Sequence, residues 1–199
     1  EHAKKCSVES LKFIINDCRE AQEAMHGWNP EKENYYADQR MTYSAELSRR
    51  YHKGVKRRFD IHVENSDFVY IDDYAHHPTE ISALLKAVKE FYPNKKVIGV
   101  FQPHLYSRTR DFLDDFSSSL SSLDELFLLP IYPAREKPIN GINSSLLLSE
   151  VQLLKKQIIA SENELFSELD SKNSFVLLTI GAGDIDEWVF SVTNYINKR

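Results

Sequence analysis

The 199-residue sequence is poor in cysteine and glycine, with two and six of these residues, and it has no long apolar run. Cys6 and Cys18 are too few for a disulfide framework and lack the spacing of a zinc site. No segment approaches the ~20 apolar residues that cross a bilayer, and the polar start "EHAKKCSVES" does not resemble a signal peptide. The sequence therefore predicts a reduced, cytoplasmic protein that does not enter a membrane.

Basic residues are not in excess, because 25 Lys and Arg stand against 30 Asp and Glu, for a formal net charge of -5. A chain with this balance is not expected to bind nucleic acid through a generally basic surface. The sequence also has no initiator methionine, which is expected of an excised domain or a processed product.

Several motifs that carry chemistry are missing as well. The sequence contains neither a GxGxxG nor a GxxxxGK[ST] phosphate loop. It also has no Gly-x-Ser-x-Gly or Cys-His arrangement that would supply an activated nucleophile. We therefore expect the chain to act by positioning a ligand and through electrostatics, without a covalent intermediate.

The residues that are present fall into two unlike parts. Residues 1–55 have helical apolar spacing in "CSVESLKFIINDCREAQEAMHGW" and are helix-compatible in "ENYYADQRMTYSAELSRRYHKG", with "GWNPEKE" as a loop and Gly54 as a stop. No group of residues here suggests chemistry, and the charges fit solvated helical faces. This part is interpreted as a helical N-terminal extension or a remnant of a preceding domain.

Residues 56–199 alternate between strand and helix patterns. The predicted strands are 57–64, 67–73, 95–101, 124–129, 155–160 and 174–180, with a turn at Asn65-Ser66. The predicted helices are 79–92, 106–123, 144–154, 162–170 and 184–196. Such alternation with short connections predicts an α/β domain, with a Rossmann-like, mostly parallel sheet and helices on both faces.

Loops rich in polar residues and glycine follow four of the predicted strands. They are Asp72–His77, Gln102–Arg108, Pro130–Pro138 and Gly181–Asp184. In an open α/β sheet, ligands bind outside the carboxyl ends of the strands. Because the starts of the strands carry nothing comparable, these four loops are the candidate binding edge.

The first of these loops, "DDYAHHP", precedes a helix that Pro78 is suited to begin. A neutral His76 or His77 at the helix start can bind a phosphate or a carboxylate. Asp72 and Asp73 could bind a ribose hydroxyl, a Mg²⁺-linked water or an ammonium group. Alternatively, Asp72 and one histidine only cap the helix. A zinc site is a weaker alternative, because adjacent histidine side chains point apart.

The loops after the third and last strands suggest anion binding less directly. Arg108 offers forked donors to a carboxylate or phosphate, whereas Arg110 is expected to pair with Asp111 or Asp114. The glycines of Gly181–Asp184 either allow a backbone to approach a phosphate or only form a tight turn.

Two further arginines stand where the two parts of the chain meet, in "GVKRRFD". Arg57 and Arg58 are predicted to enter a strand with alternating sides, so one of them alone can face a given site. The alternative is a solvated basic linker.

Five motifs, in order, resemble the C-terminal domain of the Mur ligases. They are "GVKRRFD", "DDYAHHPTEI", "FQPHLYSRTRDFLDDF", "PIYPAREKPINGINSS" and "GAGDID", and the resemblance covers about residues 52–199. The second and third motifs are most similar to those of the family member that joins L-alanine to UDP-N-acetylmuramate. The resemblance implies an ATP- and Mg²⁺-dependent ligase that works through an acyl phosphate in peptidoglycan synthesis, with most Mg²⁺ ligands on a different domain.

The resemblance also implies roles for single residues. Arg58 would contact an ATP phosphate, Asp73 the ribose, and Tyr74 the same nucleotide pocket. His76 would lie near the phosphates or the incoming amine. His104 and Arg108 would orient substrate carboxylates, including that of L-alanine, so that His76, His104 and Arg108 form the candidate catalytic group. No residue is assigned to a metal.

The sequence departs from the family pattern in three places. Ala75 stands where many members have Gly, and Leu105 stands where some have another Arg, so carboxylate binding would depend more on Arg108. The phosphate loop of the central domain is absent. We therefore expect a C-terminal fragment that is inactive alone. Two alternatives remain open: the related ligase that recycles murein tripeptide, and a free-standing module that binds a nucleotide or an amino acid.

Overall fold

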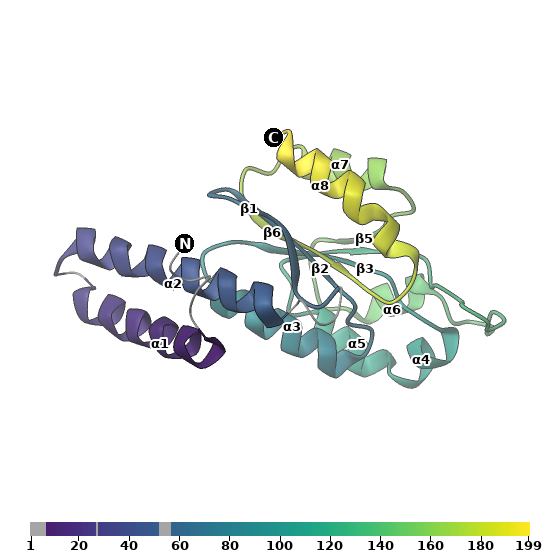
Figure 1. Cartoon of the computed structure of the whole chain (residues 1–199). Helices are drawn as coiled ribbons and strands as arrows, with labels where there is room; N and C mark the ends of the chain where they lie inside the picture. Colours follow the sequence, from purple (N-terminus) through teal and green to yellow (C-terminus); the bar gives the residue numbers. More distant parts are fainter. Residues whose placement is uncertain (1–6, 27, 52–56) are drawn as a thin grey trace. The chain divides into compact units, whose positions relative to one another are not determined.

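The computed structural model describes residues 7–26, 28–51 and 57–199. The chain forms two compact units, Glu1–Lys56 and Arg57–Arg199. Each unit is described by itself, and Figure 1 colours the elements along the sequence, from purple at the N-terminus to yellow at the C-terminus. None of the described helices is both long enough and apolar enough to cross a membrane.

The smaller unit contains two helices, α1 (Val8–Met25) and α2 (Pro30–Tyr51), which pack against each other around the buried Leu11 and Tyr43. The Ser7 side chain caps α1 by accepting from the Ser10 N–H at 3.0 Å. The predicted loop 27–33 is too long, because α2 already begins at Pro30. Asn29 promotes this early start, since its side chain accepts from the Lys32 N–H at 3.1 Å. The predicted stop at Gly54 lies outside the described residues.

The larger unit is built on one six-stranded sheet with the order β1-β2-β6-β3-β4-β5. The strands are β1 (Asp60–Glu64), β2 (Phe68–Asp73), β3 (Val97–Phe101), β4 (Glu125–Leu128), β5 (Lys156–Ile158) and β6 (Phe175–Ile180). β1 pairs antiparallel with β2, and every other pair is parallel. The predicted mostly parallel α/β sheet is therefore confirmed.

Helices cover both faces of this sheet (Figure 1). On one face lie α3 (Pro78–Phe91), α5 (Leu113–Leu120) and α6 (Ser144–Glu150); on the other lie α7 (Glu162–Leu169) and α8 (Val189–Asn197). Each face has its own apolar cluster, with Phe101 and Phe116 in the first and Phe127 and Phe175 in the second. The central strands β2, β3 and β6 are buried along their whole length, which fits the apolar residues that dominate them.

Three predicted helices are shorter or broken. The predicted helix 106–123 divides at Phe112 into α4 (Tyr106–Asp111) and α5, because Phe112 adopts φ -119° and packs its ring against His77 and the first apolar cluster. The predicted helix 184–196 begins with a 3₁₀ turn, η3 (Asp184–Trp188). α6 ends at Glu150, where the Lys156 ammonium donates to the Leu148 and Val151 carbonyls and satisfies the helix end.

Arg199 anchors the C-terminal part of the larger unit. Its guanidinium donates to three carbonyl oxygens at the end of α7, those of Leu169, Asp170 and Lys172. It also lies 5.0 to 5.9 Å from the centres of three aromatic rings, those of Phe68, Phe175 and Tyr195. A planar guanidinium with five donors can make all of these contacts at once, whereas a lysine ammonium has three donors and no flat face to stack on the rings.

We expect Arg199→Ala to lower the free energy of unfolding by roughly 2 kcal/mol, which corresponds to a decrease of about 6 °C in Tm. Arg199→Lys should recover less than half of this loss. Lys198→Ala is the matched control, because the Lys198 side chain is exposed. Thermal unfolding followed by circular dichroism measures all three variants, and equal Tm values for Arg199→Ala and Lys198→Ala would contradict the anchoring role.

Candidate ligand site at the carboxyl edge of the sheet

The strand order brings the four predicted loops together. β2, β6, β3 and β4 are consecutive neighbours in the sheet, so the loops that follow them lie side by side. Backbone hydrogen bonds join the strand ends, from Gly181 N–H to the Asp73 carbonyl at 3.1 Å and from Gln102 N–H to the Ile180 carbonyl at 3.0 Å. These loops (Tyr74–His77, Gln102–Arg108, Pro130–Pro138 and Gly181–Asp184) are called the carboxyl edge below.

Two histidines at the start of α3 have different tasks. His77 is the N-cap residue: its ring nitrogen accepts from the Thr79 N–H, and Glu80 returns a bond to the His77 N–H as a capping box. His76 is partly buried, with Nδ1 2.9 Å from the Tyr74 carbonyl oxygen and 3.5 Å from a Glu80 carboxylate oxygen. The capping role that the sequence left open therefore belongs to His77, and His76 remains a candidate for ligand contact.

Tyr74 presents a partly exposed ring, 38% accessible, at the start of the same loop. The guanidinium groups of Arg57 and Arg58 lie 5.4 and 5.9 Å from its centre, and the His76 ring meets it edge-on at 5.1 Å. Arg58 also reaches Glu80 at 3.4 Å. Burial alone would raise the pKa of Glu80, but the His76 N–H bond and the charges of His76 and Arg58 leave it lowered. This corner combines an aromatic face with fixed positive charge.

The two aspartates of "DDY" point into the protein. Asp72 is fully buried and accepts from Arg57 Nε at 2.9 Å and from the Thr179 hydroxyl at 2.7 Å. The two Asp73 oxygens accept from the N–H groups of Phe59 and Ala75 at 2.6 and 2.8 Å. Burial raises the pKa of Asp73, and these two bonds oppose that rise. A ribose hydroxyl would therefore have to share an oxygen that is already bonded. Neither aspartate caps α3.

The predicted strand 57–64 starts three residues too early, because Arg57 and Phe59 adopt left-handed conformations with φ 65° and 50°. Asp73 holds this turn through the Phe59 N–H, and the Tyr74 N–H closes it on the Arg57 carbonyl at 2.6 Å. Arg57 also donates to the Gly181 carbonyl at 2.8 Å, and its side chain is only 16% exposed. The solvated-linker alternative is therefore wrong for Arg57.

His104 and Arg108 meet directly, with 3.4 Å between His104 Nδ1 and Arg108 Nη1. The His104 ring stacks on Tyr132 with 5.7 Å between centres, and the His76 ring lies 6.2 Å away. Burial, and then the charges of Arg108 and His76, lower the pKa of His104, so that its neutral form is favoured near pH 7. The structure thus brings His76, His104 and Arg108 together.

Arg110 lies two residues after Arg108 and pairs with Asp111 at 2.7 Å, as one of the sequence alternatives predicts. The glycines of "GAGD" also have a packing explanation. Gly181 adopts φ 147°, and a Cβ at Gly183 would lie 2.7 Å from the Tyr132 ring. Tight packing therefore accounts for both glycines.

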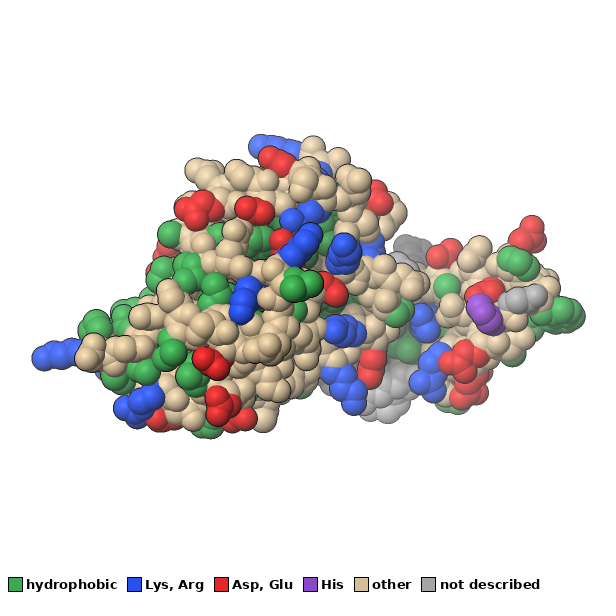
Figure 2. Space-filling model, turned by 180° about the vertical axis from the view of Figure 1, so that it is seen from behind, with side chains coloured by type: hydrophobic (Ala, Val, Ile, Leu, Met, Phe, Trp, Pro, Cys, Tyr) green, Lys and Arg blue, Asp and Glu red, His purple; other side chains and the backbone are tan. Residues whose placement is uncertain are grey.

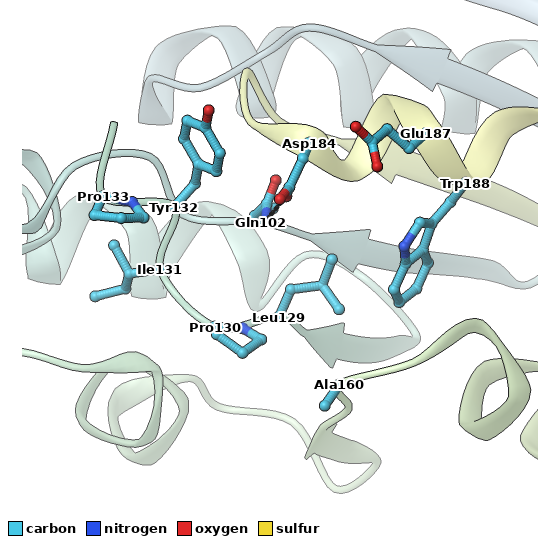
Figure 3. A pocket seen from close by; sticks show the side chains of 10 residues that line it. All are labelled: Gln102, Leu129, Pro130, Ile131, Tyr132, Pro133, Ala160, Asp184, Glu187 and Trp188. Carbon is cyan, nitrogen blue, oxygen red and sulfur yellow. Dashed lines mark hydrogen bonds between the residues drawn. The ribbon is translucent and has the colours of Figure 1, made fainter. Parts of the chain in front are cut away.

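The sequence did not predict a pocket of about 270 Å³ at this edge (Figure 3). Trp188 extends from η3 toward Ala160 and contributes apolar surface together with Leu129, while Asp184 and Glu187 of the same turn contribute carboxylates beside it. The signal was available, since Trp188 lies one turn beyond "GAGD". The sequence pattern places this residue only within the predicted helix 184–196.

The larger unit carries an excess of acidic residues, with 15 Lys and Arg against 21 Asp and Glu in residues 57–199. On the face drawn in Figure 2, Lys and Arg side chains are interspersed with Asp and Glu. Within residues 7–26, 28–51 and 57–199, no cluster of three or more His, Cys, Asp or Glu side chains could hold a metal ion. The zinc alternative therefore gains no support.

The mostly parallel sheet, with polar loops gathered at its carboxyl edge, is typical of α/β domains that bind ligands at that edge. Comparison with known families identifies the family to which the domain belongs. The sequence profile of the Mur ligase, glutamate ligase domain family matches residues 57–183. The chain belongs to the Mur ligase family.

Individual relatives show which members of the family the chain resembles closely in sequence. Two UDP-N-acetylmuramate–L-alanine ligases are similar: that of Flavobacterium psychrophilum is 54% identical over 147 residues, and that of Cytophaga hutchinsonii is 53% identical over 156. These matches cover 74% and 78% of this chain and 33% of each relative. The chain thus spans about a third of the length of the curated relatives it matches.

Solved structures agree in fold. A UDP-N-acetylmuramate–alanine ligase from Thermotoga maritima superposes with a TM-score of 0.56 at 26% identity, covering 72% of this chain and 30% of that one. A murein peptide ligase from Psychrobacter arcticus gives 0.52 at 16% identity, covering 81% and 37%. The second likeness shows the fold alone.

Proposed function

We propose that residues 57–199 serve as the C-terminal domain of an ATP-dependent ligase that joins L-alanine to UDP-N-acetylmuramate. The observation that carries this proposal is the direct contact of His104 and Arg108 beside His76, at the carboxyl edge of a sheet whose relatives bear that ligase name. Such a group of donors suits a carboxylate, and both proposed substrates carry one.

The proposed chemistry has two steps. ATP supplies the phosphoryl group that converts the lactyl carboxylate of UDP-N-acetylmuramate into an acyl phosphate. The amine of L-alanine then attacks the carbonyl carbon, the amide bond forms, the amine loses a proton and phosphate leaves. Arg108 would hold the L-alanine carboxylate, and neutral His104 would fix the guanidinium through its ring nitrogen. Orientation of the amine toward the acyl phosphate is the main contribution of this domain.

The nucleotide would lie near Tyr74 and Arg58. An exposed aromatic ring flanked by guanidinium groups fits a planar base and a phosphate. His76, 5.1 Å from the Tyr74 ring centre, lies between this corner and the Arg108 group and suits contact with the phosphates or the amine. Both oxygens of Asp73 are engaged and Asp72 is paired with Arg57, so we assign no Mg²⁺ step to this chain.

A hybrid ligase tests the proposal. Its first two thirds come from the Flavobacterium psychrophilum relative, and its matching C-terminal third is residues 57–199 of this chain. We expect phosphate release from ATP that requires both UDP-N-acetylmuramate and L-alanine. Turnover with murein tripeptide in place of L-alanine would favour the recycling ligase instead.

The 199-residue chain alone is expected to give no turnover in the same assay, because its sequence has no GxxxxGK[ST] phosphate loop. The intact relative is the positive control. Clear phosphate release by the isolated chain would contradict the assignment of this chain to one domain of a larger ligase. If the isolated chain bound ATP or L-alanine without any preceding domain, the free-standing binding module would be favoured.

A further inference from the structure

Helix α4, which carries Arg108, begins without a cap of its own. The residue before it, Leu105, adopts φ 72°, and its side chain makes no capping bond. A left-handed conformation is uncommon for leucine. The first N–H groups of a helix need acceptors from outside the helix. Something other than the local sequence must therefore hold this turn.

Glu136 supplies the missing acceptor from 29 residues further along the chain. One carboxylate oxygen accepts from the Ser107 N–H at 2.9 Å, and the other accepts a short bond from the Ser107 hydroxyl. These two bonds, and one from the Tyr106 N–H, lower the pKa of Glu136, so it is charged at neutral pH. A distant carboxylate thus replaces the usual N-cap side chain.

The loop that presents Glu136 is bound to the same segment at a second point. Tyr132 donates its N–H to the Pro103 carbonyl at 2.8 Å, and its carbonyl accepts from the Leu105 N–H at 2.9 Å. A tight turn follows, in which the Glu136 N–H bonds to the Pro133 carbonyl at 2.9 Å and Ala134 adopts φ 50°. Residues 132–136 and 103–107 are therefore tied together at both ends.

The positions of His104 and Arg108 both depend on these hydrogen bonds between residues 132–136 and 103–107, which are called the tie below. His104 lies within the tied segment and stacks on Tyr132, and Arg108 follows Ser107 directly. We propose that Glu136 is a positioning residue, which fixes the first turn of α4 and thereby sets the contact between Arg108 and His104. The identity of the ligand as L-alanine rests on the proposed function. The hydrogen bonds that Glu136 makes to α4 do not depend on it.

Amide hydrogen exchange of the full 199-residue chain, read by NMR, tests the tie. Glu136→Ala should raise exchange at Tyr106, Ser107 and Arg108 by roughly tenfold or more, because the start of the helix loses its acceptor. Glu136→Gln keeps one acceptor oxygen and should give a smaller rise. Lys137→Ala, an exposed neighbour in the same loop, is the matched control and should leave these rates unchanged. Equal rates in Glu136→Ala and the unmodified chain would overturn the proposal.

Kinetics of the hybrid ligase test the positioning. Glu136→Ala should raise KM for L-alanine roughly 10- to 100-fold and leave KM for ATP within about twofold, because only the α4 donors are displaced. Glu136→Gln should recover part of this loss. A uniform fall in kcat with both KM values unchanged would indicate general instability and overturn the positioning role.

The two experiments separate the possible failures. A hybrid that shows no L-alanine dependence before any substitution refutes the proposed function, and hydrogen exchange still decides whether Glu136 holds α4.

Discussion

Arg108→Ala in the hybrid ligase is expected to lower kcat/KM for L-alanine by roughly 10²-fold or more, about 3 kcal/mol, mainly through a higher KM. Arg108 stands at the carboxyl edge with its guanidinium against His104 Nδ1 at 3.4 Å, and the neighbouring position 105 is a leucine, which offers no second charge. A single guanidinium therefore carries most of the proposed carboxylate contact.

Arg110→Ala is the matched control, because Arg110 is exposed and pairs with Asp111 along the helix. We expect its kinetic constants to stay within about twofold, as is usual for an exposed ion pair. Arg108→Lys should recover only part of the loss, since an ammonium cannot make two parallel bonds to a carboxylate. An unchanged dependence on L-alanine in Arg108→Ala would remove Arg108 from the site.

Asp72→Ala is expected to have the largest effect on stability, a loss of roughly 3 to 5 kcal/mol in the free energy of unfolding. Asp72 is fully buried, and its removal leaves the Thr179 hydroxyl without a carboxylate partner. The Arg57 guanidinium loses its bond at 2.9 Å and keeps only the more distant carboxylate of the exposed Asp186. For a unit of this size, Tm should fall by roughly 10 °C. Because Arg57 also donates to the Gly181 carbonyl, the glycine loop should loosen as well.

Two further variants locate the cause of that loss. Asp186→Asn is the matched control, because the exposed Asp186 carboxylate lies 3.6 Å from the Arg57 guanidinium. This substitution should change the free energy of unfolding by less than about 0.5 kcal/mol. Combining Asp72→Ala with Arg57→Met should restore part of the stability, since no buried charge is then left unpaired. Chemical denaturation measures all four proteins. Equal stability of Asp72→Ala and Asp186→Asn would show that the buried pair is not important.

Local patterns in the sequence predicted the elements well where a single physical signal was present. The apolar residues of α3 recur at helical spacing, and the buried strands are continuous apolar runs, so their existence and type were recoverable. The predicted ends of helices and strands were wrong where a residue distant in the sequence determines them. Asp73 converts the predicted start of β1 into a turn, and the packing of Phe112 divides α4 from α5.

The candidate site shows the same division. The residue types at the strand ends predicted an anion-binding edge, with His76, His104 and Arg108 as candidate residues. Which groups face a ligand was not recoverable, because it depends on partners far along the chain. Asp72 is turned inward by Arg57 and Thr179, and Glu136 reaches Ser107 from another loop.

The sequence by itself determined the class of fold, the family and the set of loops that carry polar residues, because these follow from periodicity and motifs that are local in the chain. The tertiary structure alone decided that β6 lies between β2 and β3, which brings the four loops together. It also decided which charges are buried in pairs and which stay available. A carboxylate or guanidinium takes its role from the partner it meets, and that partner is set by packing of segments that are distant in sequence.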